Sequence, residues 1–129
     1  MAKTRECNSA VIKGRLAKAI EFLAAAEHLD EGMPNAAGDL LVDAGIAASD
    51  VICCIRLGVH SSSGAHSDAL TLLKNADTAS EKHLSVLLGL KSKAAYTHQT
   101  LSIAELKKMN RAACQLVETA KRLLAATGR

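Results

Sequence analysis

The chain has 129 residues, among them 24 alanines and 18 leucines, with one proline, one phenylalanine, one tyrosine and no tryptophan. Alanine and leucine favour helices, which argues against an all-β or Rossmann-type fold, and the 49% hydrophobic content excludes intrinsic disorder. Residues 1–64 carry six Lys or Arg against eight Asp or Glu, whereas residues 65–129 carry ten against five. The basic second half can attract a polyanion but is too weakly charged for a dedicated DNA-binding surface.

The first two predicted helices are separated by a break that contains Gly32 and Pro34. The first covers about residues 8–29 and the second about residues 36–57, because apolar residues recur in both at three- and four-residue steps. Gly58 is predicted to end the second helix, and residues 61–64 form a short polar loop. The short break between the first two helices predicts that they are antiparallel neighbours.

Three acidic residues of the second helix share one edge. Asp39, Asp43 and Asp50 fall within about 40° of one another at 100° per residue. Such carboxylates could hold Mg²⁺ or act as acid and base, but a solvated face, or salt bridges to the basic final helices, is the simpler interpretation. Asp50 stands among alanine, valine and isoleucine, so it is the member predicted to be partly buried.

The second half of the chain predicts three more helices. The third covers about residues 65–75, the fourth starts at a capping box over residues 78–81 and runs to about Tyr96, and a second capping box over residues 102–105 opens a long last helix that ends at Gly128. The residues expected to be buried in the fourth and last helices are Leu84, Leu87, Leu88, Ala95, Leu106, Met109, Ala113, Leu116, Val117, Ala120 and Leu124. The predicted fold class is all-α: an antiparallel up-and-down bundle of about five helices in a single domain, residues 1–129.

The four cysteines, Cys7, Cys53, Cys54 and Cys114, show no C-x-x-C spacing, which speaks against a zinc ribbon or a thioredoxin-like motif. The adjacent pair cannot readily bridge within a helix, so four free, mostly buried thiols in a reducing cytoplasm are expected. The first residues lack the apolar core of a signal peptide, and no stretch is long and apolar enough to span a membrane. A soluble, cytoplasmic protein without a membrane partner is therefore predicted.

The five histidines form no H-x-x-x-H or E-x-x-H pair on one helix. His60 and His66 flank the serine loop with Asp68 nearby, and could line an anion or metal pocket, although polar contacts at a helix start are the simpler interpretation. Glycine-rich phosphate loops are also missing from the sequence. We therefore predict neither a bound metal nor a cofactor.

The segment Leu90–His98 combines the residue types with the most chemistry. It ends the fourth helix with two cations and the only tyrosine, followed by a histidine. A lysine and a titratable imidazole one or two turns apart could hold a phosphate and shuttle a proton. Alternatively, the lysines favour the helix C-terminus, Tyr96 caps the core and His98 starts a loop.

Several segments, taken in order, resemble the HEPN superfamily of small helical domains. They are Arg15–Leu23 (RLAKAIEFL), Ala44–Asp50 (AGIAASD), His66–Leu70 (HSDAL), Leu90–Tyr96 (LKSKAAY) and Ala112–Val117 (AACQLV). The resemblance covers most of the chain and implies a bundle that dimerises. Many members carry a metal-independent ribonuclease site and act as toxins or in defence against foreign nucleic acid, and others are non-catalytic binding modules.

The catalytic signature of the superfamily is an arginine, usually followed by a polar residue, then four to six residues and a histidine. By this resemblance Lys91 takes the arginine position, Ser92 the polar position and His98 the histidine position, whereas Lys93 gives the four-residue spacing. Lysine offers only a point charge where arginine can hold a phosphate by two hydrogen bonds, and Ala95 stands where many members have an acidic residue before the tyrosine. The spacing is kept while the chemistry is weakened.

Two functions follow. In the first, the protein acts on or binds RNA as a metal-independent endoribonuclease-like toxin or defence protein, or as a catalytically weakened relative, with a cognate antitoxin as a candidate partner. His98 would be the general acid and base, Lys91 or Lys93 would stabilise the phosphate, and Ser92 and Tyr96 complete the site. In the second, the protein is a non-enzymatic homodimeric module that binds a nucleotide or a partner protein, which the scarcity of stacking aromatics favours. The thin, alanine-rich core predicts a homodimer in both cases.

Overall fold

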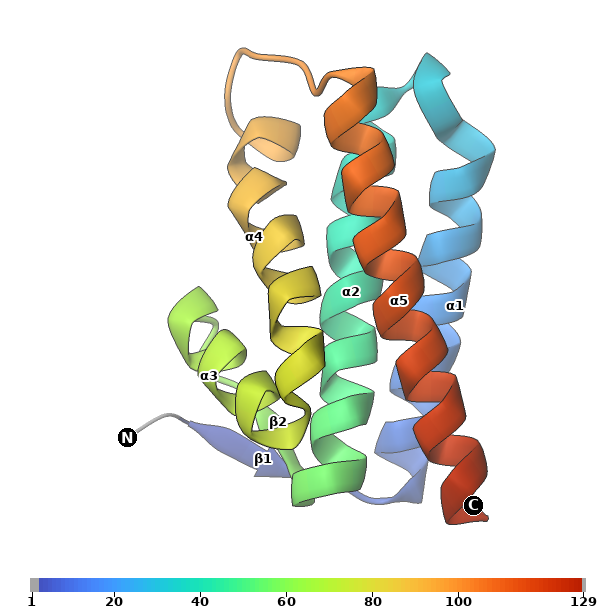
Figure 1. Cartoon of the computed structure of the whole chain (residues 1–129), viewed down its shortest axis with the longest axis vertical. Coiled ribbons are helices and arrows are strands. Elements are labelled where there is room, and N and C mark those ends of the chain that lie inside the picture. Colours follow the sequence, from blue (N-terminus) through green and yellow to red (C-terminus); the bar gives the residue numbers. More distant parts are fainter. Residues whose placement is uncertain (1–2, 129) are drawn as a thin grey trace.

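The computed structural model describes residues 3–128, and the chain is mostly helical (Figure 1). The helices are α1 (Ser9–Leu29), α2 (Pro34–Leu57), α3 (His66–Ala76), α4 (Glu81–Ala95) and α5 (Ile103–Thr127). Two 3₁₀ turns, η1 (Asp30–Gly32) and η2 (Thr78–Ser80), precede α2 and α4, and two short strands, β1 (Thr4–Glu6) and β2 (Val59–Ser61), form one antiparallel pair. The predicted bundle of five helices is confirmed.

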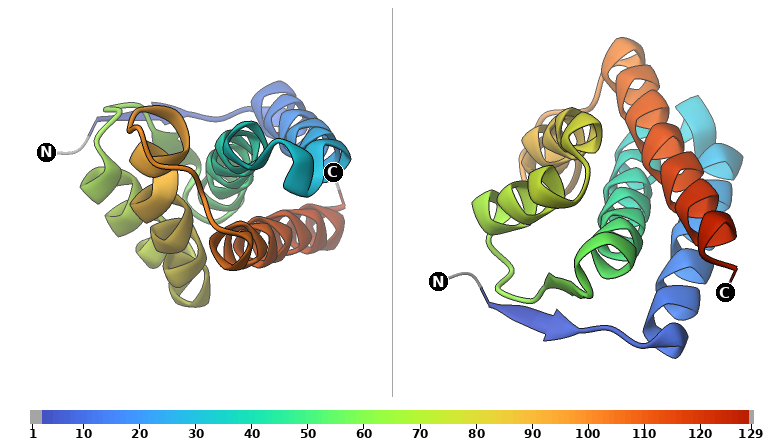
Figure 2. Two further views of the ribbon diagram at one scale, coloured as in Figure 1. Left: turned by 90° about the horizontal axis from the view of Figure 1, so that it is seen from above. Right: turned by 60° about the horizontal axis from the view of Figure 1, so that its bottom comes forward.

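Helix α2 is the centre of the bundle and packs against each of the other four helices. The four long helices alternate in direction, and the short α3 lies beside α2 and α4 on the side of the strands (Figures 1 and 2). Helix α4 consequently has two different neighbourhoods, with α2 and α3 on one side and α5 on the other. These two sides of α4 position the candidate sites.

Small residues allow α2 to lie close to its neighbours. Four alanines and two glycines of α2 are buried. A Cβ atom added at Gly45 would lie 2.2 Å from Leu87 Cδ1, and one added at Gly38 would lie 2.3 Å from Leu101 Cδ1. Larger residues at these two positions would therefore force neighbouring side chains or helices to move.

Several predicted helix ends are confirmed. Ser102 Oγ accepts a hydrogen bond from the backbone N–H of Glu105, and the Glu105 carboxylate accepts one from the backbone N–H of Ser102, which completes the capping box of α5. Gly58 and Gly128 end α2 and α5 with φ values of 78° and 74°, a conformation that glycine adopts without strain.

The capping box predicted at Thr78 is wrong. Thr78 opens η2, its hydroxyl donates to the Lys74 carbonyl, and α4 begins at Glu81 without a side-chain cap. The Ser80 hydroxyl donates to the Asp77 carboxylate instead. Local side-chain bonds of this kind compete with capping, so the T-x-x-E pattern marks the 3₁₀ turn before the helix and not the cap itself.

Most of the core predicted for α4 and α5 is buried, with two exceptions. Ala95 is exposed and Ala94 is buried in its place, because the last turn of α4 faces α5, where Lys93 meets Glu105. Leu124 is only partly buried, near the end of α5. In α1 the three- and four-residue spacing placed Ile12, Ala19, Ile20 and Ala26 on one apolar stripe; Ile12, Ala19 and Ala26 are buried, whereas Ile20 is 41% exposed.

The strand pair was not expected from the composition. It joins the start of the chain to the segment after α2, with Arg5 opposite His60 in an antiparallel register. Gly58 turns the chain at the end of α2, and its carbonyl accepts a 3.0 Å hydrogen bond from the backbone N–H of Cys7. This pairing brings residues near position 7 to the last turns of α2.

Cys7 and Cys54 form a disulfide, so the expectation of four free thiols is wrong. Their Cα atoms are 5.6 Å apart although the two residues are separated by 47 positions in the sequence. Cys53 and Cys114 are the free cysteines of the described residues. Cys53 is buried, and its burial, together with the charge of Asp50, raises the pKa of its thiol to about 12. The Cys53 thiol is therefore protonated and unreactive at neutral pH.

Candidate functional site

The segment predicted to hold the catalytic residues ends α4 and continues into an exposed loop at the end of the bundle opposite the strands (Figure 1). Tyr96 follows the last residue of α4 and is 76% exposed, so it does not cap the core. His98 is exposed in the same loop, and Ser92 is exposed on α4. The backbone N–H of Leu101 donates to Asn35 Oδ1 at 3.0 Å and ties the loop to the start of α2. Tyr96 and His98 are thus presented to solvent.

The fold separates the two lysines of this segment. Lys91 and Lys93 are two residues apart and therefore lie about 200° from each other around α4. Lys93 Nζ donates to Glu105 Oε1 at 2.9 Å, whereas Lys91 lines a cavity against α2. The predicted set of cations and histidine is not gathered at one point: Lys93 is paired with α5, Lys91 faces α2 and His98 faces solvent.

The acidic edge of α2 contains three residues with different surroundings. Asp50 is partly buried, as predicted, and its Oδ2 accepts a hydrogen bond from Arg15 Nε at 3.1 Å and lies 2.9 Å from Arg15 Nη2. The salt bridge is therefore made with α1 and not with the basic final helices. Burial, with the charge of Asp39, raises the pKa of Asp43, while Lys91 and Arg15 act against this rise.

A cavity of about 190 Å³ lies between α2, α3 and α4. We call it the α2–α3–α4 cavity; it is lined by Ile46, Ser49, Asp50, Cys53, Ser61, Gly64, Ala65, His66, Ala69, Leu84, Leu88 and Lys91. The residues from α2 and from α4 each recur at three- and four-residue steps, so one side of each helix forms a wall. Burial raises the pKa of the Asp50 carboxyl, while the charges of Arg15 and His60 act in the opposite direction.

The predicted group of His60, His66 and Asp68 is divided. His66 lines the cavity, whereas His60 Nδ1 lies 4.0 Å from Asp50 Oδ2 and contacts the Ser61 carbonyl at 3.0 Å. Asp68 accepts a hydrogen bond from Ser63 in the loop before α3, which is the helix-start contact that the simpler interpretation predicted. Among the side chains that the structure describes (residues 3–29 and 31–128), no three His, Cys, Asp or Glu are grouped as metal ligands.

The opposite side of α4 forms an open, basic groove with α5 of about 490 Å³. We call it the α4–α5 groove; it is lined by Lys82, His83, Val86, Lys108, Arg111, Ala112 and Gln115. The lining given by the described residues contains no Asp or Glu, and none of its three permanent cations makes an ion pair with a described residue. Burial, with the charge of Lys82, lowers the pKa of His83, so its ring is neutral at neutral pH.

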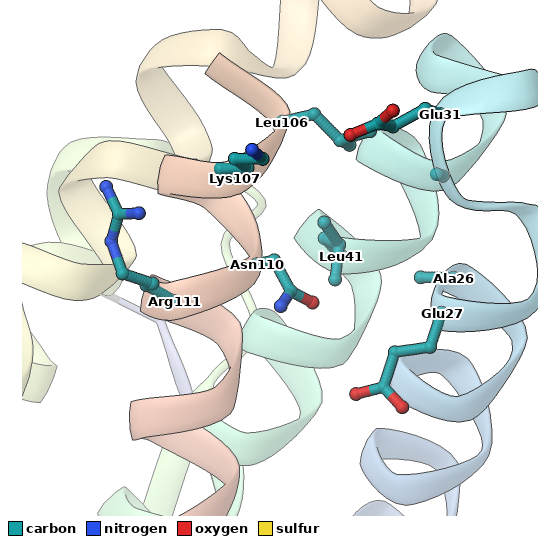
Figure 3. Close-up of a pocket in the computed structure, with 9 residues that line it drawn as sticks. Ala26, Glu27, Glu31, Leu41, Leu106, Lys107, Asn110 and Arg111 are labelled. Atoms are coloured by element: carbon teal, nitrogen blue, oxygen red, sulfur yellow. The ribbon is translucent and has the colours of Figure 1, made fainter. Parts of the chain in front are cut away.

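A third hollow, of about 410 Å³, lies between α1, α2 and α5 (Figure 3). Glu27 and Glu31 line it from the side of α1 and η1, and α5 contributes Lys107 and Arg111, the latter shared with the α4–α5 groove. Asn110 points into the space between the two walls. This mixture of signs has no preference for an anion, which distinguishes the third hollow from the α4–α5 groove.

Two features of these sites escaped the prediction from sequence. Lys91 lies seven residues after Leu84 and three after Leu88, so it continues the buried stripe of α4, where a charged residue is unusual. That signal was present in the sequence. The α4–α5 groove had no comparable signal, because it depends on which sides of two helices meet.

Comparison with known proteins adds no relative, since no protein-family model matches the chain and no curated protein gives a significant match. None of the helices formed by the described residues has both the length and the apolar character that crossing a bilayer requires.

Proposed function

We propose that this protein is a HEPN-like RNA-binding domain in which the ribonuclease site is catalytically weakened. The observation that supports this most directly is the α4–α5 groove, where Lys82, Lys108 and Arg111 are free of ion pairs among the described residues and no acid joins the lining. Lysine and arginine contacts to phosphates supply the sequence-independent part of RNA binding. An open groove of one charge sign suits a polyanion better than either of the other two hollows.

The exposed loop at the end of α4 supplies the second element of the proposal. Tyr96 is one of only two aromatic residues of the chain and is 76% exposed. Single-stranded RNA bases stack on such rings, each contact being worth about 1–3 kcal/mol. Lys82 lies in the first turn of α4 and Tyr96 directly follows its last residue, so the two are 14 positions apart, or about 20 Å along the helix axis. An RNA strand that follows α4 would reach both the groove and the loop.

Weakened catalysis follows from the positions of the two lysines. Lys93 is paired with Glu105, and Lys91 lines the cavity on the other side of the helix. Neither lysine of the predicted signature is therefore free to act with His98, and a second copy of the chain could supply a cation there. The proposal therefore expects RNA binding with little cleavage.

A non-enzymatic homodimeric module is the second candidate function. Met33 and Ile103 are 60% and 55% exposed, and both lie at the same end of the bundle as the loop, where α2 and α5 begin. A second copy of the chain could cover these apolar side chains and bring two copies of His98 together. Multi-angle light scattering of the wild type and of Met33→Lys with Ile103→Lys tests this: a dimer in the first and a monomer in the second support it, and a monomeric wild type at micromolar concentration excludes it.

The test of RNA binding uses fluorescence anisotropy with a labelled single-stranded RNA. The double variant Lys108→Glu with Arg111→Glu should weaken binding by about tenfold or more and reduce its dependence on salt. The matched control, Lys13→Glu with Lys18→Glu on α1, makes the same change of net charge on exposed residues away from the groove. Equal losses in both double variants, or no loss in either, would contradict the proposed interface.

The test of weakened catalysis uses transfer RNA and messenger RNA with a chelator present. The wild type and His98→Ala should both leave the RNA essentially intact. Efficient cleavage that His98→Ala abolishes would show an active ribonuclease in place of the weakened one.

A further inference from the structure

We propose that the α2–α3–α4 cavity is a binding site for a small zwitterion of the amino-acid type, with its ammonium group on Asp50 and its carboxylate on Lys91 and His66. The three residues belong to three different helices and line one partly open cavity. This inference is independent of the proposed RNA binding, which uses the opposite side of α4.

Asp50 has one carboxylate oxygen engaged and one available. Its contacts with Arg15 and His60 are all made through Oδ2. Within the described residues, Oδ1 makes no hydrogen bond or ion pair, and no fully buried side-chain oxygen or nitrogen lacks a partner. Oδ1 is therefore reached by solvent, and Asp50 is one of the residues that line the cavity. A carboxylate oxygen in this position can accept a hydrogen bond from a ligand ammonium group.

Lys91 brings the opposite charge to the same cavity. Its ammonium group makes no ion pair with any described carboxylate, although its charge acts on Asp43. It lies on the buried stripe of α4, where the side chain is partly shielded from water. The charge of Asp50 is compensated by Arg15 through Oδ2, whereas the charge of Lys91 has no counter-charge among the described residues. A zwitterion would give Lys91 a carboxylate partner and would place its own ammonium group on the remaining oxygen of Asp50.

The rest of the lining limits the size and character of the ligand. Leu84, Leu88 and Ile46 form an apolar wall that suits an aliphatic side chain. The volume of about 190 Å³ is below the roughly 300–1,000 Å³ of sites for drug-sized ligands, so a whole nucleotide is too large. Ser49 Oγ already donates to the Gly45 carbonyl at 2.8 Å and can only accept a further hydrogen bond.

The experiment measures thermal shifts and calorimetric binding of the full chain with L-leucine at up to about 10 mM, the range of weak millimolar binding. Two analogues each remove one charge: 3-methylbutylamine lacks the carboxylate and 4-methylpentanoate lacks the ammonium group. We expect leucine to raise the melting temperature progressively as its concentration increases, and each analogue to bind about tenfold more weakly or worse. L-valine and L-alanine complete the zwitterion panel.

Matched variants locate the site. Lys91→Gln should weaken binding by about tenfold, whereas Lys93→Gln, on the side of α4 that faces Glu105 of α5, should leave it within about twofold. Asp50→Asn removes the carboxylate that would bind the ligand ammonium group, but it also disturbs the Arg15 contact and can prevent folding. Ala69→Leu is therefore the second variant: it should abolish binding by filling the cavity without altering a charge. The proposal is overturned if no zwitterion of the panel binds, if Lys91→Gln and Lys93→Gln behave alike, or if adenosine or cytidine monophosphate binds in the cavity and the amino acids do not.

Discussion

The two sides of α4 show how one helix can carry two kinds of site. The side that carries Leu84 and Lys91 closes a cavity with α2 and α3, and the side that carries Lys82 and Val86 opens a groove with α5. Both sides contain a lysine, but solvent screens the one in the groove, so several cations can gather there at little cost. A cation on the partly buried side gains from a counter-charge, which the protein or a ligand can supply.

The largest expected difference between the two sides is in stability. Leu84 is 1% exposed, so Leu84→Ala should lower the free energy of unfolding by about 2–5 kcal/mol through lost burial and the space left behind. Val86 lines the open groove and is only partly buried, so Val86→Ala should cost about 1 kcal/mol or less. Urea unfolding followed by circular dichroism measures both. Similar losses for the two variants would show that the two sides of α4 are equally enclosed.

The disulfide offers a second way to separate the two regions. Cys7→Ser should lower the free energy of unfolding by about 2–4 kcal/mol, because the bond closes a long loop of the unfolded chain. Cys114→Ser, which changes a free thiol on α5, is the control and should cost less than about 1 kcal/mol.

The location of that loss can also be measured. Amide hydrogen exchange in Cys7→Ser should increase over residues 4–6 and 59–61, which the disulfide holds near α2, and not in the α4–α5 groove. Uniform acceleration across the whole chain would contradict this division.

The smallest expected effect is that the pKa values of two carboxyl groups shift in opposite directions. The backbone N–H of Ser102, with the ammonium group of Lys93, holds the pKa of Glu105 below its usual 4.5, so its contribution to stability is present above that pH and is lost as the pH falls through the lower folded-state value. Burial raises the pKa of Asp50 above its usual 3.8, so the protonated form is favoured in the fold and the corresponding stability is lost as the pH rises through the folded-state value.

Carbon-13 NMR titration of the side-chain carboxyl groups checks both directions. Asp50 should titrate above its ordinary range and Glu105 below its own. In Lys93→Gln, the pKa of Glu105 should rise while that of Asp50 stays unchanged. Titration of Asp50 below its ordinary range would show that Arg15 outweighs burial.

Where a helix forms, starts and ends depends on residues that are close in the sequence. The sequence by itself therefore determined the number and approximate bounds of the five helices. Apolar residues at three- and four-residue steps identified five helices, the pair Ser102 and Glu105 predicted the start of α5, and Gly58 the end of α2. The capping box predicted at Thr78 from the same kind of local pattern was wrong, because side-chain hydrogen bonds at the 3₁₀ turn replace the cap. It also placed Asp50 as a partly buried acid without finding its partner.

Only the tertiary structure decided which distant residues meet. The pairing of β1 with β2 joins Cys7 to Cys54 across 47 positions, and the argument for a reducing compartment from four free thiols no longer applies. From the sequence, either Lys91 or Lys93 could have been the cation that acts with His98, because both have an acceptable spacing to it. In the fold they lie on different sides of α4: Lys91 faces Asp43 and the cavity, and Lys93 faces Glu105. Local periodicity fixes the side of a helix on which a residue lies, whereas the chemistry of that side depends on the helix packed against it.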